Sequence, residues 1–239
     1  MPAPHALAEQ FQSFVRDPAF PCVGAKAALA RDNMRIIVCR DLGSAWDDLR
    51  ILPEITQLAE DYRADREMFQ TLVVIFEQPE VIGEAEFEER LWERIQSLAD
   101  KDALLLENAH DARVNDDPDD PHFSLSFGGE AFFVVGLHPG ASRPARRFER
   151  PALVFNLHDQ FEQLRAQDRY EKLRSSILDR DLRLAGTPNP MLARHGQVSE
   201  ARQYSGRSVD ADWECPYAGR GAGAQPPSDA AAQEAQDEA

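Results

Sequence analysis

The chain has 239 residues, of which 43% are hydrophobic, and a formal net charge of −16 at pH 7. It is long enough to bury a sizeable core, and its negative charge argues against a nucleic-acid partner, which would need a basic face. No apolar run approaches the roughly 20 residues that span a bilayer, the N-terminus lacks signal-peptide features, and the three cysteines are too few for a disulfide framework. We therefore expect a cytoplasmic protein without a nucleic-acid or membrane partner.

The first hundred residues show the periodicities of both helices and strands. Residues 84–99 carry the clearest helical pattern, with one apolar stripe opposite a dense glutamate face. Residues 71–76 form an apolar run without alternation, which is typical of a buried strand. The remaining predictions are helices over 6–16 and 25–31, a strand over 34–39, and a helix whose stripe contains Trp46, Leu49, Ile55, Leu58 and Tyr62 and is interrupted by Pro53.

The second part of the chain begins with a predicted hairpin. Residues 123–127 alternate apolar residues with serine, Gly128-Gly129 is a turn signal, and residues 130–137 form the returning strand. Residues 152–157 are either another strand or the start of the helix that carries Phe161 and Leu164. A further helix is predicted over 170–184.

This order of elements predicts a single α/β or α+β domain over residues 6–217, with a mixed central sheet and helices packed against it. Residues 219–239 are rich in Gly, Ala, Pro, Gln and acidic residues and contain no aromatic residue. Such a composition cannot bury enough apolar area to offset the entropy of ordering, so we expect a disordered tail.

The charges are unevenly distributed along the chain. From Glu77 to Asp120 there are fifteen acidic and four basic residues, whereas from Arg143 to Arg183 there are ten basic and seven acidic ones. The acidic stretch is explained by a solvated helix face. The basic stretch opens with four arginines within eight residues, which repel one another unless an anion neutralises them. This arginine loop is a candidate site for an acidic ligand.

Several histidines and cysteines are candidate ligands for a metal. His138 ends an apolar strand before Pro139, and a strand-end histidine bonded to the backbone explains it equally well. His158 follows a second apolar run, and a helix-start histidine with an acidic neighbour explains it equally well. His195 is expected in a loop. Cys22 and Cys215 each adjoin a proline and could present a thiolate to haem iron, although a small buried hydrophobe is the simpler interpretation of both.

Long blocks of this sequence resemble the YqcI/YcgG family over about residues 11–217. The blocks are unusual in composition, and they are spread along the chain. They are Phe20-Pro21-Cys22; Asp120-Pro-x-Phe-Ser-x-Ser-Phe-Gly-Gly129; His138-Pro139 with Ser142-Arg143 and Ala145-Arg-Arg-Phe148; Leu153-Val-Phe-Asn-Leu-His158; Asn189-Pro-Met-Leu192; Ser199 to Arg207; and Trp213-x-Cys215-Pro216.

The resemblance implies a haem-dependent oxygenase, since known members of that family include N-hydroxylases of cycloserine and guanitoxin biosynthesis that act on a guanidine group. It implies haem b as cofactor, a small guanidine- or amine-containing substrate, dioxygen and an external electron donor. It does not identify the substrate, the electron donor or the iron ligand. Two other functions are compatible with the same residues. One is a non-catalytic haem- or anion-binding carrier or sensor, and the other is a purely structural interaction domain with an unoccupied arginine loop.

On this interpretation each candidate residue has a role. Arg143, Arg146 and Arg147 are expected to bind the haem propionates. His138 is the first choice of iron ligand because it lies near these arginines in the sequence, with His158 second and Cys215 third. Glu200 is the candidate partner of a cationic substrate, and an ion pair with Arg202 or Arg207 is its alternative. An apolar pocket or, equally, the core would be lined by Phe123, Phe127, Phe132, Phe133 and Phe155.

Overall fold

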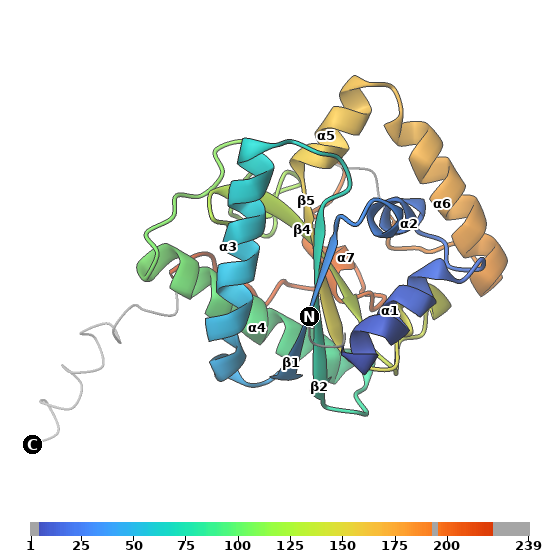
Figure 1. Ribbon diagram of the computed structural model, residues 1–239, viewed down its shortest axis with the longest axis horizontal. Coiled ribbons are helices and arrows are strands. Elements are labelled where there is room, and N and C mark those ends of the chain that lie inside the picture. The colour runs from blue at the N-terminus through green and yellow to red at the C-terminus, as the bar shows by residue number, and fades with distance from the viewer. Residues whose placement is uncertain (1–4, 193–195, 222–239) are drawn as a thin grey trace, which may run out of the picture.

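The computed structural model describes residues 5–192 and 196–221, which form one body around a mixed five-stranded sheet (Figure 1). The strand order is β1-β2-β5-β4-β3, in which β1 and β2 are parallel and the other neighbours are antiparallel. The strands are β1 (Met34–Asp41), β2 (Thr71–Gln78), β3 (Leu125–Phe127), β4 (Glu130–Leu137) and β5 (Ala152–Leu157).

Helices cover both faces of the sheet, which gives an α+β arrangement of three layers. In Figure 1, α3 (Asp48–Ala64) and α4 (Glu84–Leu104) lie on one side of the sheet. The helices on the other side are α1 (Ala6–Arg16), α2 (Val23–Ala30), α5 (Asp159–Ala166) and α6 (Tyr170–Ala185). The short helix α7 (Ala201–Tyr204) contacts β4.

Each face of the sheet has its own hydrophobic core, because successive side chains of a strand point to opposite faces. The core under α3 and α4 is dense and includes Phe132, Val134 and Phe155. On this face Gly136 lets α4 approach closely, since a Cβ there would lie 2.6 Å from the Phe87 ring. The core under α1 and α2 is smaller and includes Val73 and Leu137, with Val135 and Val154 only partly buried against it.

The structure confirms the predicted fold class and most predicted elements. Of the two alternatives for residues 152–157, it shows the strand. The predicted apolar stripe before Tyr62 is wrong in part, because α3 begins only at Asp48 and Trp46 lies in a separate 3-10 turn, η1 (Ala45–Asp47). Trp46 and Leu49 are 80% and 69% exposed, so they do not belong to the core.

A buried ion pair joins the two helices of the dense layer. The carboxylate of Asp48, at the start of α3, accepts hydrogen bonds from Arg94 and from Lys101 (2.8 Å), both on α4. The Arg94 guanidinium also donates to the carbonyl of Leu42 (2.9 and 3.1 Å). Since both charges are out of water, removing one partner would leave the other without compensation.

The C-terminal described segment packs across α4. The Trp92 ring lies 5.6 Å from the ring of Tyr204 and 6.2 Å from that of Tyr217. Arg220 donates to the carboxylate of Asp102 (2.6 Å), which is fully buried. The packed part of the chain thus extends past the predicted boundary at residue 219, while residues 222–239 of the predicted tail lie outside the described residues. No helix in the described ranges is long and apolar enough to cross a membrane.

Candidate functional site

A cavity of about 260 Å³ lies between the sheet and the helices of the looser face. Its walls are mostly apolar, with a few polar and charged side chains. On one side the cavity is bounded by partly exposed side chains of β4 and β5. On the side away from the sheet it is covered by α1, α2, α5 and α6. The lining includes Phe11, Phe20, Cys22, Ala25, Phe69, Phe133, Val135, Leu137, Arg143, Arg146, Val154, Asn156, Gln160, Phe161, Leu173, Ile177, Asp181 and Gln203.

Cys22 places a thiol in this cavity at the N-terminus of α2. Its sulfur accepts a hydrogen bond from the backbone N–H of Ala25 (3.4 Å), so it caps the helix. Burial raises the pKa of the thiol, against the opposing effects of the backbone N–H groups of Ala25 and Gly24 and of the nearby Arg146 and Lys26. The thiol is therefore protonated until something in the cavity, such as a metal, favours the thiolate.

Arg146 places a cation in the same cavity, held only by carbonyl groups. Its guanidinium donates to the backbone carbonyls of Gly136 (2.9 Å), Gln203 (3.0 Å) and Tyr204 (3.2 Å). Among the described residues no carboxylate forms an ion pair with it, and burial lowers its pKa to about 10, although the charge of Asp181 opposes this shift. A buried cation without an anionic partner is costly, so an anionic ligand in this cavity would be favoured.

The other arginines of the arginine loop are engaged elsewhere. Arg143 lines the cavity, but it forms a largely buried ion pair with Asp181 on α6 and donates to the carbonyl of Thr187 (3.1 Å). Arg147 is exposed and donates to carbonyls of its own loop at Ala141 (2.9 Å) and Ser142. Arg150 pairs with Glu80 (3.0 Å). Of the three arginines predicted to bind propionates, the structure brings two to the cavity.

Polar side chains at the opposite part of the lining are bonded to one another. The side-chain amide of Gln160 exchanges two hydrogen bonds of 2.8 Å with the backbone of Gln70. The hydroxyl of Thr71 donates to the side-chain oxygen of Asn156 (3.1 Å) and to a backbone carbonyl. These contacts fix the junction of β2, β5 and α5, and they leave few groups free to bind a ligand.

The structure places His138 on the other face of the sheet from the cavity. Along β4, Phe133, Val135 and Leu137 line the cavity, so the alternate positions point toward α4. His138 continues the second set, and its ring stacks on Phe87 with centroids 4.3 Å apart. Burial lowers its pKa, and its Nδ1 has no hydrogen-bond partner among the described residues. His138 therefore does not line the cavity, although its backbone N–H bonds to the carbonyl of Arg146 (3.0 Å) and the charge of Arg146 also lowers its pKa.

The remaining predicted ligands also lie away from the cavity. His158 is buried just before α5, with its Nε2 3.8 Å from Glu162. Cys215 packs against the dense core on the α4 side, and burial raises its pKa to about 12. His195 lies outside the described residues. Of the five predicted phenylalanines only Phe133 lines the cavity, because the other four are fully buried in the dense core.

Glu200 is buried near the cavity but does not line it. Its Oε1 accepts hydrogen bonds of 2.6 Å from the hydroxyls of Ser124 and Tyr204. The Tyr204 ring packs edge-on against Phe133, with centroids 5.3 Å apart, and Phe133 lines the cavity. Burial raises the pKa of Glu200 to about 7, although Ser124, Tyr204 and the charge of Arg165 oppose this shift.

The predicted alternative for Glu200, an ion pair with Arg202 or Arg207, is not formed. Arg207 pairs with Glu88 (2.9 Å), and Arg202 donates to the backbone carbonyls of Trp213 and Asp210.

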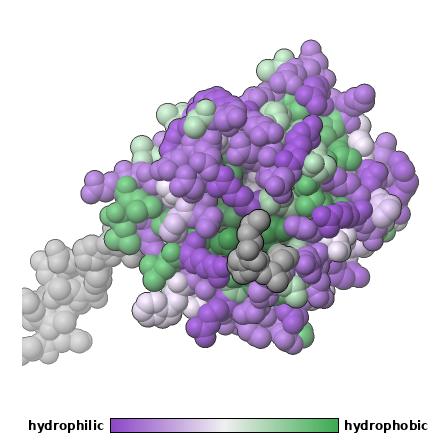
Figure 2. All heavy atoms as spheres, viewed as in Figure 1, coloured by the Kyte–Doolittle hydropathy of each residue, from purple (hydrophilic) through white to green (hydrophobic). Residues whose placement is uncertain are grey.

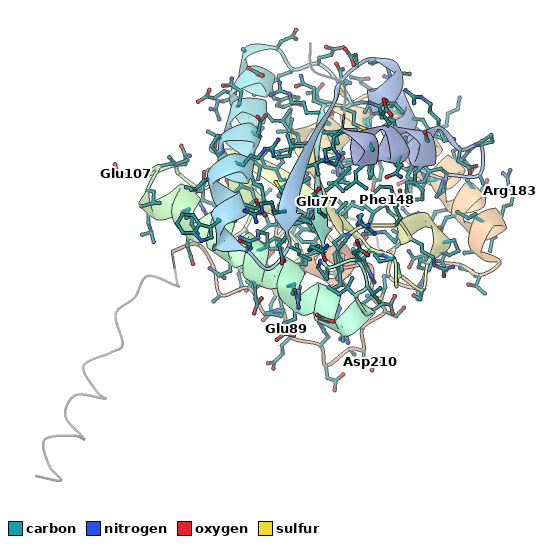
Figure 3. The ribbon with its side chains drawn as sticks, turned by 60° about the horizontal axis from the view of Figure 1, so that its bottom comes forward. Glu77, Glu89, Glu107, Phe148, Arg183 and Asp210 are labelled. Carbon is teal, nitrogen blue, oxygen red and sulfur yellow. The ribbon has the colours of Figure 1, made fainter. Side chains whose placement is uncertain are left out.

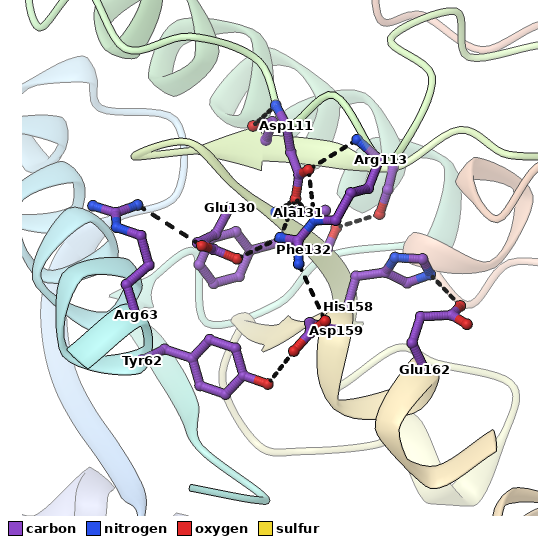
Figure 4. Close-up of polar contacts among 12 residues, drawn as sticks. Tyr62, Arg63, Asp111, Arg113, Glu130, Ala131, Phe132, His158, Asp159 and Glu162 are labelled. Atoms are coloured by element: carbon purple, nitrogen blue, oxygen red, sulfur yellow. Dashed lines mark hydrogen bonds and ion pairs between the residues drawn. The ribbon is translucent and has the colours of Figure 1, made fainter. Parts of the chain in front are cut away.

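A second polar cluster surrounds Arg113 (Figure 4). Its guanidinium binds the carboxylates of Asp111 (2.6 Å), Glu130 (2.6 Å) and Asp159 (3.1 Å). Asp159 also accepts a hydrogen bond from the hydroxyl of Tyr62 (2.7 Å). Because these charges neutralise one another, we assign the cluster a structural role: it ties the loop before β3 to β4, α3 and α5.

Comparison with protein families gives a match to the YqcI/YcgG family model over residues 11–218. The chain belongs to the YqcI/YcgG family. The matched range contains all the described cavity residues, and it also contains the Glu200 cluster. Comparison with curated proteins and with solved structures gave no match.

Some residues of the cavity carry no signal in the sequence. Asp181 lies in a helix with many charged residues, so nothing distinguished it from a solvated carboxylate. The sequence also could not show which residues of β4 face the cavity, because the residues at the alternate positions of β4 are apolar as well. Cys22 did carry a signal, since it belongs to the Phe-Pro-Cys block.

We predict that Glu200 makes the stability of the fold depend on pH. Its folded-state pKa of about 7 is above the ordinary value of 4.5, so its contribution is fully present below pH 4.5 and is lost as the pH rises through 7. The shift corresponds to about 3 kcal/mol. Glu200→Gln should therefore become more stable relative to the wild type between pH 5 and pH 8, as measured by urea unfolding.

Glu89→Gln, at an exposed position of α4 (Figure 3), is the control and should show no such trend. Parallel profiles for Glu200→Gln and the wild type would contradict the assignment.

Proposed function

We propose that this protein is a haem b-dependent oxygenase that N-hydroxylates a small guanidine- or amine-containing metabolite with dioxygen and an external reductant. The observation that carries the proposal is the convergence of the Cys22 thiol and the Arg146 cation on one apolar cavity. Membership of the YqcI/YcgG family supports it, because known haem-dependent N-hydroxylases resemble this family.

The residues of the cavity fit haem in their chemistry. Apolar and aromatic walls suit a porphyrin, and a cation that lacks an anionic partner suits a propionate. Cys22 is the iron ligand that the geometry favours, because His138, His158 and Cys215 do not line the cavity and Cys22 does. Bound haem would supply the activation of oxygen, which a thiolate ligand promotes.

The chain itself would contribute binding, orientation and exclusion of water. The N-terminus of α2 and Arg146 would stabilise the negative charge on the Cys22 sulfur, as their effects on its pKa indicate. The ion pair between Arg143 and Asp181 would hold α6 against the arginine loop, which keeps the cavity closed on that side. The apolar walls would keep bulk water away from the reacting groups.

The first test is haem binding by the purified full chain. We expect about one haem b per chain, and a strongly red-shifted Soret band for the carbon-monoxide adduct of the ferrous protein, as a thiolate ligand gives. Cys22→Ser should abolish this shift, whereas Cys215→Ser should retain it. A histidine-type spectrum in the wild type would overturn the choice of Cys22, and a folded protein that binds no haem would overturn the proposed function.

A second prediction concerns the role of Arg146. Arg146→Ala should weaken haem binding by about 1–3 kcal/mol, the range for hydrogen bonds to charged groups. Arg147→Ala is the matched control, since Arg147 lies in the same loop but is exposed and bonded to its own backbone. Titration of both apo proteins with haem gives the comparison. Equal affinities would show that Arg146 does not bind a propionate.

A haem carrier or sensor is the second candidate function. One observation favours it: the side chain of Gln160 is bonded to the backbone of Gln70, and Thr71 is bonded to Asn156, so few lining groups are free to bind a substrate. Turnover separates the two functions. With dioxygen and a chemical reductant, an N-hydroxylase should convert at least one member of a panel of guanidines and amines to a product 16 mass units heavier. If haem binds but the whole panel gives neither product nor a spectral shift, the carrier function replaces the enzymatic one.

A further inference from the structure

Helix α6 covers the cavity but buries almost nothing of its own. Leu173, Ile177 and Asp181 follow one another at intervals of four residues, so they lie on one face of the helix, and all three line the cavity. The structure describes every residue of α6, and Asp181 is the only buried one among them. Leu173 and Ile177 are half-buried. Little apolar packing therefore holds this helix, and elements of this kind open most easily.

α6 lies at the rim of the molecule (Figure 1). Its main contacts within the described chain are with α2, α5 and η2 (Pro144–Arg146), and the cavity lies between it and the strands. Figure 2 shows mostly hydrophilic side chains where Figure 1 places α6, and Lys172, Ser175 and Asp179 are exposed. An outward movement of α6 would thus expose the cavity without disrupting either hydrophobic core.

Two consecutive residues of α6 hold it in place through polar contacts. The guanidinium of Arg180 donates to the backbone carbonyls of Pro18 (2.6 Å) and Phe20 (3.1 Å), in the loop that leads to Cys22. The carboxylate of Asp181 forms the largely buried ion pair with Arg143 of the arginine loop. When both partners of such a pair return to water together, hydration offsets the lost attraction, so the contact can open reversibly.

Each end of α6 has a residue with a left-handed backbone at which the helix can turn. Asp168, two residues before α6, has a φ of 54°, and Gly186, directly after it, has a φ of 74°. A Cβ atom on Gly186 would meet no other atom within 4 Å, so packing does not fix this end. Hinges are usually a few residues at the ends of elements that absorb a change of backbone angle.

The volume of the cavity indicates that one wall must move. About 260 Å³ is below the roughly 300–1,000 Å³ of pockets that hold drug-sized ligands. A larger ligand enters only if a wall gives way. The helices α1, α2 and α5 each bury at least one apolar side chain, whereas α6, described over its whole length, buries none. The wall that moves at the least cost is therefore α6.

We propose that α6 is a lid over the cavity, hinged at Asp168 and Gly186 and latched by Arg180 and Asp181. The closed lid keeps bulk water from the Cys22 thiol, and the open lid lets a ligand enter and leave. This inference goes beyond the proposed function and does not depend on it, because the lid would serve any ligand of the cavity.

The Cys22 thiol reports the opening, because a reagent must enter the cavity to reach it. The full chain is treated with N-ethylmaleimide, a neutral thiol reagent, and mass spectrometry of the peptides follows each cysteine. Asp181→Asn and Arg180→Gln should each accelerate the modification of Cys22 at least tenfold. Asp179→Asn and Arg183→Gln (Figure 3), at exposed positions of α6, are the matched controls and should react at the wild-type rate.

The two latch variants also separate an open lid from a more reactive thiol. Loss of the Asp181 carboxylate favours the thiolate of Cys22, whereas loss of the Arg180 cation disfavours it. Electrostatics alone would therefore change the two rates in opposite directions, and an open lid accelerates both. Cys39, which is buried in the dense core, reports global unfolding and should react much more slowly than Cys22 in every variant. The proposal is wrong if either latch variant reacts at the wild-type rate, if a control is accelerated as well, or if Cys39 reacts together with Cys22.

A second measurement needs only the wild type. The effect of urea on an opening reaction scales with the surface that the opening exposes. Modification of Cys22 should therefore change little with urea below the unfolding transition, whereas modification of Cys39 should rise steeply. Equal urea dependence of the two thiols would show that Cys22 reacts only through global unfolding, and it would overturn the lid. Both experiments are made without haem, so their failure is distinct from a failure to bind haem.

Discussion

Side-chain alternation along β4 governs which residues can reach the cavity, because each residue of a strand belongs to one face of the sheet only. Phe133, Val135 and Leu137 face the cavity, whereas Phe132 and Val134 are buried under α3 and α4. The two faces of the sheet differ in packing. Large apolar side chains fill the face under α3 and α4, whereas the other face keeps a cavity beneath α2 and α6. A ligand of this protein is therefore expected on the looser face, whatever its chemistry.

The electrostatics of the cavity depend on a cation that the fold holds with dipoles alone. Three backbone carbonyls, from β4 and α7, fix the guanidinium of Arg146. Carbonyl groups orient a cation but do not cancel its charge. The arginine favours the thiolate of Cys22, and the pKa of the arginine is raised first by the charge of Asp181 and then by that of the sulfur. Neither Cys22 nor Arg146 forms an ion pair with a carboxylate in the described ranges, which distinguishes them from the neutralised cluster around Arg113.

Local patterns in the sequence predicted the fold well, because periodicity and turn residues act within a few positions. The stripe of α4 and the glycine turn before β4 are examples. The site was less predictable, since it depends on which face a residue occupies. His138 lies close to Arg146 in the sequence, but the alternation of β4 places their side chains on opposite faces. Cys22 was not predicted as the first choice of ligand because it is far from the arginines in the sequence. Only the packing of α2 against the looser face brings it to Arg146.

The segment from α7 to Arg220 affects how the domain is assembled during synthesis. Trp92 lies on α4, in the first half of the chain, but its aromatic neighbours Tyr204 and Tyr217 come from the last part. The buried Asp102 likewise obtains its arginine from position 220. Contacts of such long sequence separation form late and slow folding, because the intervening loop must first be closed. While the ribosome still holds these last residues, the Trp92 side of α4 lacks its aromatic partners, so the core on this side of the nascent chain stays unfinished.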